Sequence, residues 1–288
     1  MADLTPVMLR DPSSPLSAVY VPGAGMIATS LSDGGIELLG QRRGLDAYLS
    51  AGKTMGIPLL YPWANRLSAK TYDVDGETVT LTPDAYGVRP DNNGLPIHGL
   101  LAAYPRWRAQ QVSDQKLTAE LDFGAQDELH ASFPFPHLVE LTVELSNHTL
   151  TVSTTVTPTT DKAVPFVYGY HPYLQLPDVP RHQWQVELPT MRQLILDDTG
   201  IPTGATAETP ANRGTVGRHG VRRWFRSGRR RGGIRGVRRR TQAGGAVRPG
   251  LPGRTGVRSR RRDGHLLRTN GRAHRRIAPR RLPIRAAG

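Results

Sequence analysis

Hydrophobic and polar residues alternate along several short stretches of this chain, and a period of two is typical of β-strands with one buried face. In residues 137–145 (HLVELTVEL), Val or Leu occupies every second position from Val139 to Leu145, and Glu or Thr lies between them. Residues 149–156 alternate in the same way after the polar residues 146–148. Two such stretches joined by a short polar link predict a β-hairpin.

Two more hairpins are predicted around Asp-Gly pairs, which supply the positive φ angles that a tight hairpin turn needs. Residues 26–32 and 36–39 flank Asp33-Gly34-Gly35, and residues 72–74 and 78–82 flank Asp75-Gly76-Glu77. Helical periodicity of useful length is absent, and residues 46–51 are expected to form one short helical turn at most. Many short strands with Gly- and Pro-rich connections predict an all-β sandwich or barrel.

Charge divides the 288 residues into two unlike parts. Residues 1–212 hold 13 basic and 23 acidic residues, a formal charge of −10. Residues 213–288 hold 25 Arg and one acid, Asp263, a formal charge of +24. The net charge of +14 therefore describes neither part. We expect residues 1–212 to be the folded body and residues 213–288 to be an irregular, Arg-rich tail.

Composition excludes several classes of protein. The chain has no Cys, which excludes disulfides, a thiolate zinc site and a cysteine nucleophile. No apolar run is long enough for a membrane span and no secretory signal is visible, so a cytoplasmic protein with no membrane partner is expected. The tail would attract any polyanion, but Trp224 and Phe225 are its only aromatic residues and no nucleic-acid-binding fold is evident, so no specific nucleic-acid partner is expected.

The body contains two short polar motifs in apolar surroundings. Asn65 and Arg66 lie in residues 58–67 (PLLYPWANRL), where a guanidinium can donate paired hydrogen bonds to sugar hydroxyls or a carboxylate. An Arg that fixes a loop to backbone carbonyls is an equally good interpretation. His98 precedes Gly99, which allows backbone or ligand to approach the ring closely, and a buried, hydrogen-bonded His is the alternative.

A third motif, residues 165–174 (PFVYGYHPYL), places His171 among Tyr168, Tyr170 and Tyr173. An aromatic surface with one proton-transferring group suits a sugar, whose C–H faces stack on rings. Aromatic core packing is the competing interpretation. None of the three motifs has the spacing of metal ligands, so no metal site is predicted.

In their order and separation, these motifs resemble the aldose 1-epimerases (galactose mutarotases). The resemblance rests on PLLYPWANRL, on IHG with Trp107 downstream, on PFVYGYHPYL and on DTGIPTG at residues 198–204, and it covers about residues 15–205. It implies a large antiparallel β-sandwich. It also implies interconversion of the α and β anomers of free aldohexoses such as galactose or glucose, without a metal or organic cofactor.

The resemblance also implies roles for individual residues. Arg66 would bind sugar hydroxyls with Asn65 as a supporting neighbour, and the aromatic motif itself adds Tyr173 as an expected substrate-binding residue. His98 would stabilise the ring oxygen, and His171 would be the general acid that protonates this oxygen as the ring opens. Ring opening also needs a carboxylate that removes the proton of the anomeric hydroxyl. The family supplies it from a C-terminal segment similar to CFEPM, and an Asp in a segment similar to FDDGF also contacts the sugar.

Residues 213–288 contain no Glu, but another reading frame recovers the missing segments. Codons chosen for residues 265–279 (HLLRTNGRAHRRIAP), read one nucleotide later, encode ICFEPMAAPTDALL. The same frame gives AFDDGF from residues 220–226, GYPVAQVF from residues 250–258 and YPFVRP from residues 282–288. We therefore interpret the tail as a frameshifted reading of the family's C-terminal strands.

The shift is placed between Pro210 and His219, and the catalytic Glu would be encoded across the Arg268–Thr269 junction. The body is then expected to lack its last strands, to leave sheet edges open and to have impaired activity. A non-catalytic carbohydrate-binding sandwich is the alternative function. An enzyme acting on hexose 6-phosphates would need more basic residues around the site than residues 1–212 contain. The sequence does not predict the oligomeric state.

Overall fold

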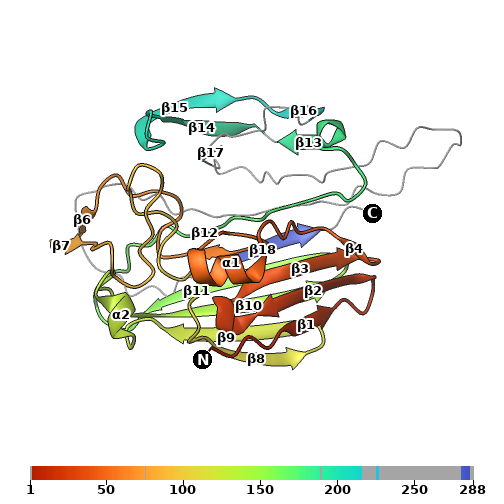
Figure 1. The fold of residues 1–288 in the computed structure, drawn as a ribbon, viewed down its shortest axis with the longest axis horizontal. Helices are drawn as coiled ribbons and strands as arrows, with labels where there is room; N and C mark the ends of the chain where they lie inside the picture. Colours follow the sequence, from red (N-terminus) through yellow and green to blue (C-terminus); the bar gives the residue numbers. More distant parts are fainter. Residues whose placement is uncertain (1, 75, 189, 216–224, 227–279, 286–288) are drawn as a thin grey trace, which may run out of the picture.

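The computed structural model describes residues 2–74, 76–188, 190–215, 225–226 and 280–285, and two antiparallel sheets form its main body (Figure 1). One sheet has the order β1-β2-β3-β4, with β1 (Val7–Arg10), β2 (Leu16–Val21), β3 (Ile27–Asp33) and β4 (Ile36–Glu37). The other has the order β18-β11-β10-β9-β8, with β8 (Arg108–Ser113), β9 (Lys116–Asp122), β10 (His137–Ser146), β11 (Thr149–Pro158) and β18 (Arg280–Arg285). The expectation of an all-β, antiparallel fold is confirmed.

Shorter elements connect and extend these sheets. The additional strand groups are β5 (Leu59–Leu60) with β12 (Gly169–Tyr170), β6 (Thr71–Val74) with β7 (Glu77–Thr80), β13 (Gln185–Leu188) with β16 (Asn212–Thr215), and β15 (Pro202–Thr209), β14 (Met191–Leu196) and β17 (Phe225–Arg226). The helices are α1 (Gly44–Ala51), α2 (Asp127–His130) and two 3-10 turns at Pro22–Ala24 and Arg181–Gln183. In the part of the chain that the structure describes, no helix has the length and apolar character needed to cross a membrane.

The three predicted hairpins form as expected. β10 pairs with β11 across a two-residue turn in which both Asn147 (φ 50°) and His148 (φ 55°) have positive φ angles, as a type I′ hairpin turn requires. Gly34 and Gly35 provide the same geometry between β3 and β4. β6 pairs with β7 in the third hairpin, where Asp75 lies outside the described residues.

The helical turn expected at residues 46–51 is longer than predicted. α1 spans eight residues from Gly44, and its end is set by Gly52, whose left-handed φ of 63° lets its N–H donate to the carbonyl of Tyr48 at 3.0 Å. The ring of Tyr48 is fully buried, and its hydroxyl accepts a hydrogen bond from the Ala103 N–H at 3.0 Å. Burial of this one aromatic ring stabilises a helix whose own periodicity is too weak to predict it.

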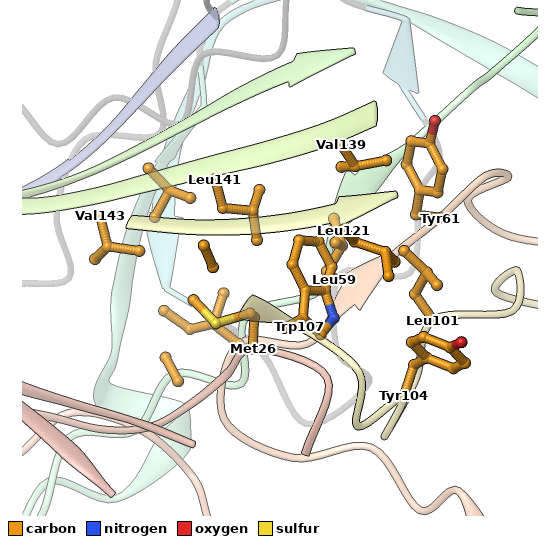
Figure 2. Packing of buried hydrophobic residues seen from close by; sticks show 14 of the residues in the cluster. Met26, Leu59, Tyr61, Leu101, Tyr104, Trp107, Leu121, Val139, Leu141 and Val143 are labelled. Carbon is orange, nitrogen blue, oxygen red and sulfur yellow. The ribbon is translucent and has the colours of Figure 1, made fainter. Parts of the chain in front are cut away.

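The hydrophobic core lies between the two main sheets. Figure 2 shows Val139, Leu141 and Val143 in succession along β10, and all three are at most 2% exposed. The same cluster of buried residues includes Leu9 and Leu31 from the N-terminal sheet, so the inward faces of both sheets meet in one core. A fully buried Val or Leu contributes about 1.5–3 kcal/mol, and this layer makes the two sheets a sandwich.

The C-terminal strands extend beyond this sandwich. In Figure 1, β13, β14, β15 and β16 lie above the main sheets, and β15 is exposed along seven of its eight residues. The tail was expected to be irregular, but its described part contains β17, which pairs with β14, and β18 (Arg280–Arg285), which pairs with β11. Most of the segments interpreted as frameshifted, including the Arg268–Thr269 junction, lie outside the described residues.

Candidate active site

The three motifs found in the sequence come together in space. Residues 58–67 run between residues 95–100 and residues 165–174, and short backbone pairings connect all three. These pairings join Leu59 to Tyr170, Leu60 to Gly169, Trp63 to Val167, Tyr61 to Gly99 and Arg66 to Ile97. The side chains of Arg66, His98 and His171 are consequently held by one continuous backbone network.

Gly99 makes the closest of these contacts possible. A Cβ at this position would lie 2.1 Å from the carbonyl oxygen of Tyr61, and the backbone φ of 71° is left-handed. The same carbonyl accepts hydrogen bonds from the N–H groups of Leu100 at 2.7 Å and Leu101 at 3.2 Å. The backbone of Tyr61 thus approaches Gly99 itself, and the close approach of a ligand to the His98 ring stays a prediction.

His98 is fixed by the backbone of Asn65. The Asn65 N–H donates to Nδ1 of His98 at 3.3 Å, and the His98 N–H donates to the Asn65 carbonyl at 2.9 Å. Because Nδ1 accepts, the proton of the neutral ring lies on Nε2. Burial, together with the neighbouring His171 and Arg66, lowers the pKa of His98 to about 4. At neutral pH His98 is therefore an uncharged hydrogen-bond donor.

His171 is packed between two rings. Its ring centroid lies 6.0 Å from that of His98 at an interplanar angle of 75°, and it stacks on Tyr173 at 4.6 Å and 21°. The Tyr173 hydroxyl hydrogen-bonds to Oγ1 of Thr54 at 2.5 Å, and the guanidinium of Arg42 lies 4.9 Å from the Tyr173 ring centroid. The Tyr173 ring thus supports His171, and the Tyr173 hydroxyl already has a hydrogen-bond partner in Thr54.

The His171 imidazole is in an environment that favours its neutral form. Burial is the main cause that lowers its pKa, and the positive charge of Arg42 adds to this effect. Its Nδ1 is buried and has no hydrogen-bond partner in the described part of the chain. Among the described residues, no carboxylate hydrogen-bonds to the side chain of His98 or His171.

Arg66 is anchored by a buried carboxylate. Its Nε donates to Oδ2 of Asp91 at 2.5 Å and its Nη1 donates to Oδ1 of Asn65 at 3.2 Å. The Arg66 side chain is 24% exposed and that of Asp91 is 4% exposed. Arg66 therefore fixes a loop, as one interpretation of the motif predicted, but through the carboxylate of Asp91 and not through backbone carbonyls. The partly exposed guanidinium keeps donors for a ligand.

Sequence reasoning missed the residues that hold this site in place. Asp91 begins a turn (residues 91–94, DNNG) whose composition predicts a loop but not a contact with Arg66. Arg42 and Thr54 contact Tyr173 only through the tertiary structure. No periodicity or spacing connects them to residues 165–174.

Replacing Arg42 with Gln is expected to raise the pKa of His171. The substitution removes a positive charge next to the stacked Tyr173–His171 pair, and a nearby positive charge disfavours the imidazolium. An NMR titration of the His171 ring protons measures this directly, and Arg43→Gln is the matched control, because among the described residues Arg42 is the arginine that lies over the Tyr173 ring. An unchanged His171 titration in the Arg42 variant would contradict the electrostatic role of Arg42.

The fold and the site define an antiparallel β-sandwich protein with one anchored guanidinium and two uncharged imidazoles side by side. The family model for Aldose 1-epimerase matches residues 17–221, well over half of the chain. This chain belongs to the aldose 1-epimerase family.

Individual relatives are distant and longer than the matched region. The chain is 28% identical over 173 residues to YphB of Escherichia coli K12, and the match covers 58% of this chain and 55% of YphB. The crystal structure of Slr1438 from Synechocystis superposes with a TM-score of 0.56 at 22% identity, covering 72% of this chain and 65% of that one. A galactose mutarotase-like protein from Clostridium acetobutylicum gives a TM-score of 0.57 at 20% identity, covering 67% and 59%. These structures show that the fold is shared.

Proposed function

We propose that the site binds a free aldohexose for acid–base interconversion of its α and β anomers, and that this chain is impaired in catalysis because the C-terminal Glu is absent. The convergence of Arg66, His98 and His171 from three separate segments carries the proposal. A partly exposed guanidinium and two adjacent imidazoles match the hydroxyls and the ring oxygen of a pyranose. Membership of the aldose 1-epimerase family supports the same assignment.

The proposed chemistry requires two proton transfers. A base takes the proton of the anomeric hydroxyl, the bond between C1 and the ring oxygen breaks as C1 becomes an aldehyde carbon, and the ring oxygen receives a proton. In this assignment Arg66 holds sugar hydroxyls, Nε2–H of His98 donates to the ring oxygen and His171 supplies the proton. Rotation about the C1–C2 bond and reversal of both transfers then give the other anomer.

Because the pKa of His171 is lowered, the loss of the Glu is expected to affect both proton transfers. Burial and Arg42 both favour the neutral His171 ring and so reduce the fraction that carries the proton it must donate. A carboxylate placed across the site would raise this pKa. The absent Glu therefore removes the base and also a charge that would keep the acid protonated.

A frameshift in the gene accounts for the missing Glu. The family match ends at residue 221, close to the segment between Pro210 and His219 where we place the shift. From residue 213 onwards the composition changes to 25 Arg with one acid. Resequencing the gene across codons 205–225 tests this explanation, and an intact frame there would refute it.

Polarimetry on freshly dissolved α-D-glucose or α-D-galactose tests the proposed function. We expect anomer exchange no faster than the spontaneous reaction, together with sugar binding detected by NMR titration. Exchange well above the spontaneous rate that disappears in His171→Ala would show that another group replaces the Glu. Absence of sugar binding would refute the assignment of the site.

A carbohydrate-binding sandwich without catalytic activity is the second candidate. It is favoured by the lack of any carboxylate hydrogen-bonded to the two site imidazoles among the described residues. The two candidates differ once the frame is restored, because a pure binding protein would stay inactive.

A further inference from the structure

Asp91 lies at the start of a tight turn and satisfies three donors at once. Its Oδ1 accepts from the N–H groups of Asn93 at 2.8 Å and Leu95 at 2.9 Å, and its Oδ2 accepts from Nε of Arg66. These bonds, with that of Arg66 the strongest among them, outweigh burial and keep the pKa of Asp91 below its usual range. The carboxylate is therefore ionised next to the guanidinium throughout the neutral pH range.

A second turn confines Arg66 from another direction. Asp197 caps the turn that leads to Gly200 by accepting from the N–H groups of Thr199 and Ile201, each at 2.9 Å. A Cβ at Gly200 would lie 3.3 Å from Nη1 of Arg66, so the guanidinium packs closely against this turn. Nδ2 of Asn93 donates to the Thr199 carbonyl at 3.4 Å and connects the two turns.

The hydrogen bonds of Arg66 divide its donors into two groups. Nε–H is used by Asp91 and one N–H of Nη1 is used by Asn65, which leaves three of the five guanidinium N–H groups without a partner among the described residues. An Arg side chain free to rotate would lose much of its advantage in binding, because ordering it costs entropy. Asp91 removes that cost before a ligand arrives.

We propose that Asp91 is a positioning residue, which holds the guanidinium of Arg66 so that its remaining donors face the sugar hydroxyls. The inference rests on the proposed function, because it assumes that Arg66 binds the sugar. The whole effect of Asp91 on sugar binding passes through Arg66.

A double-mutant cycle on the full chain tests this dependence. Asp91→Asn keeps an oxygen for the two backbone N–H groups of the turn but presents no charge to Arg66. We expect D-galactose to bind roughly tenfold more weakly, because binding must then order the Arg66 side chain, as measured by NMR titration. In an Arg66→Met background the same substitution is expected to change the affinity less than twofold, because the group it positions is gone.

Asp11→Asn is the matched control. Asp11 is 5% exposed and also caps a turn, because its Oδ1 accepts from the Ser13 N–H at 2.9 Å, but it lies between β1 and β2 and supplies no contact to the site. It is expected to lower the melting temperature without changing the affinity for D-galactose. A similar loss of affinity in this control would show that Asp91 acts only through general stability.

A second measurement needs no sugar. Hydrogen exchange of the Arg66 Nε–H is expected to be slow in the unsubstituted chain and at least tenfold faster in Asp91→Asn, because the buried acceptor is lost. Equal exchange rates would overturn the inference, as would an equal loss of affinity in both backgrounds of the cycle. If the unsubstituted chain binds no sugar, the proposed function fails and this inference fails with it.

Discussion

Deleting one nucleotide between codons 210 and 219 is expected to raise the rate of anomer exchange by roughly 100-fold or more, the contribution typical of a positioned general acid–base pair. The deletion moves the downstream reading one nucleotide later, into the frame in which we propose that CFEPM and FDDGF are encoded. It supplies the base that ring opening needs, and the new carboxylate also favours the protonated form of His171. Polarimetry on the purified products of both genes measures the difference.

The control for this experiment is a second change in the restored gene. The codon that the restored frame reads across the Arg268–Thr269 junction is changed from Glu to Gln, which keeps the size of the side chain and removes its charge. We expect this variant to bind sugar and to lose the gained activity. A restored chain with the Glu intact that exchanges anomers no faster than the original would refute the frameshift explanation of impaired catalysis.

Replacing Gly99 with Ala is expected to lower the free energy of unfolding by more than about 3 kcal/mol, from the left-handed backbone and the clash together. The added Cβ would lie 2.1 Å from the carbonyl oxygen of Tyr61, which has to move and is itself hydrogen-bonded to two N–H groups. Separation of Gly99 from Tyr61 displaces His98 relative to His171, so sugar binding should be lost as well. Denaturant unfolding and NMR titration measure the two effects.

Gly34→Ala separates the clash from the backbone strain. Gly34 also has a left-handed φ of 57°, but nothing lies within 4 Å of the position its Cβ would take. Its cost is expected to be about 1–2 kcal/mol, from the backbone alone. Equal costs at the two glycines would show that the contact between Gly99 and Tyr61 is not tightly packed.

Local patterns predicted the strands well because a half-buried strand leaves its period in the sequence. The alternation in residues 137–145 corresponds to β10, and its apolar positions face the core. α1 was underestimated because its stability depends on the burial of Tyr48. The strand at Arg280–Arg285 was not predicted, since no sustained alternation marks it and pairing with β11 supplies its partner.

The sequence predicted the residues that bear the chemistry of the candidate site, but not the residues that hold them in place. Arg66, His98 and His171 were identified from their own motifs, and the structure brings them together. Asp91 and Arg42 were not identified, because each acts on a residue that is distant along the chain. Their charges influence the site through space, and a sequence records no distances.

The sequence by itself determined the class of fold, the boundary in composition at residue 212 and the three motifs that bear the chemistry. These properties depend on the period of apolar residues, on net charge and on residue type, all of which are local. Only the tertiary structure decided that Asp91 anchors Arg66, that Asn65 sets the tautomer of His98 and that Arg42 acts on His171. Hydrogen bonding, burial and charge proximity set these properties, and they exist only once the three segments have packed together.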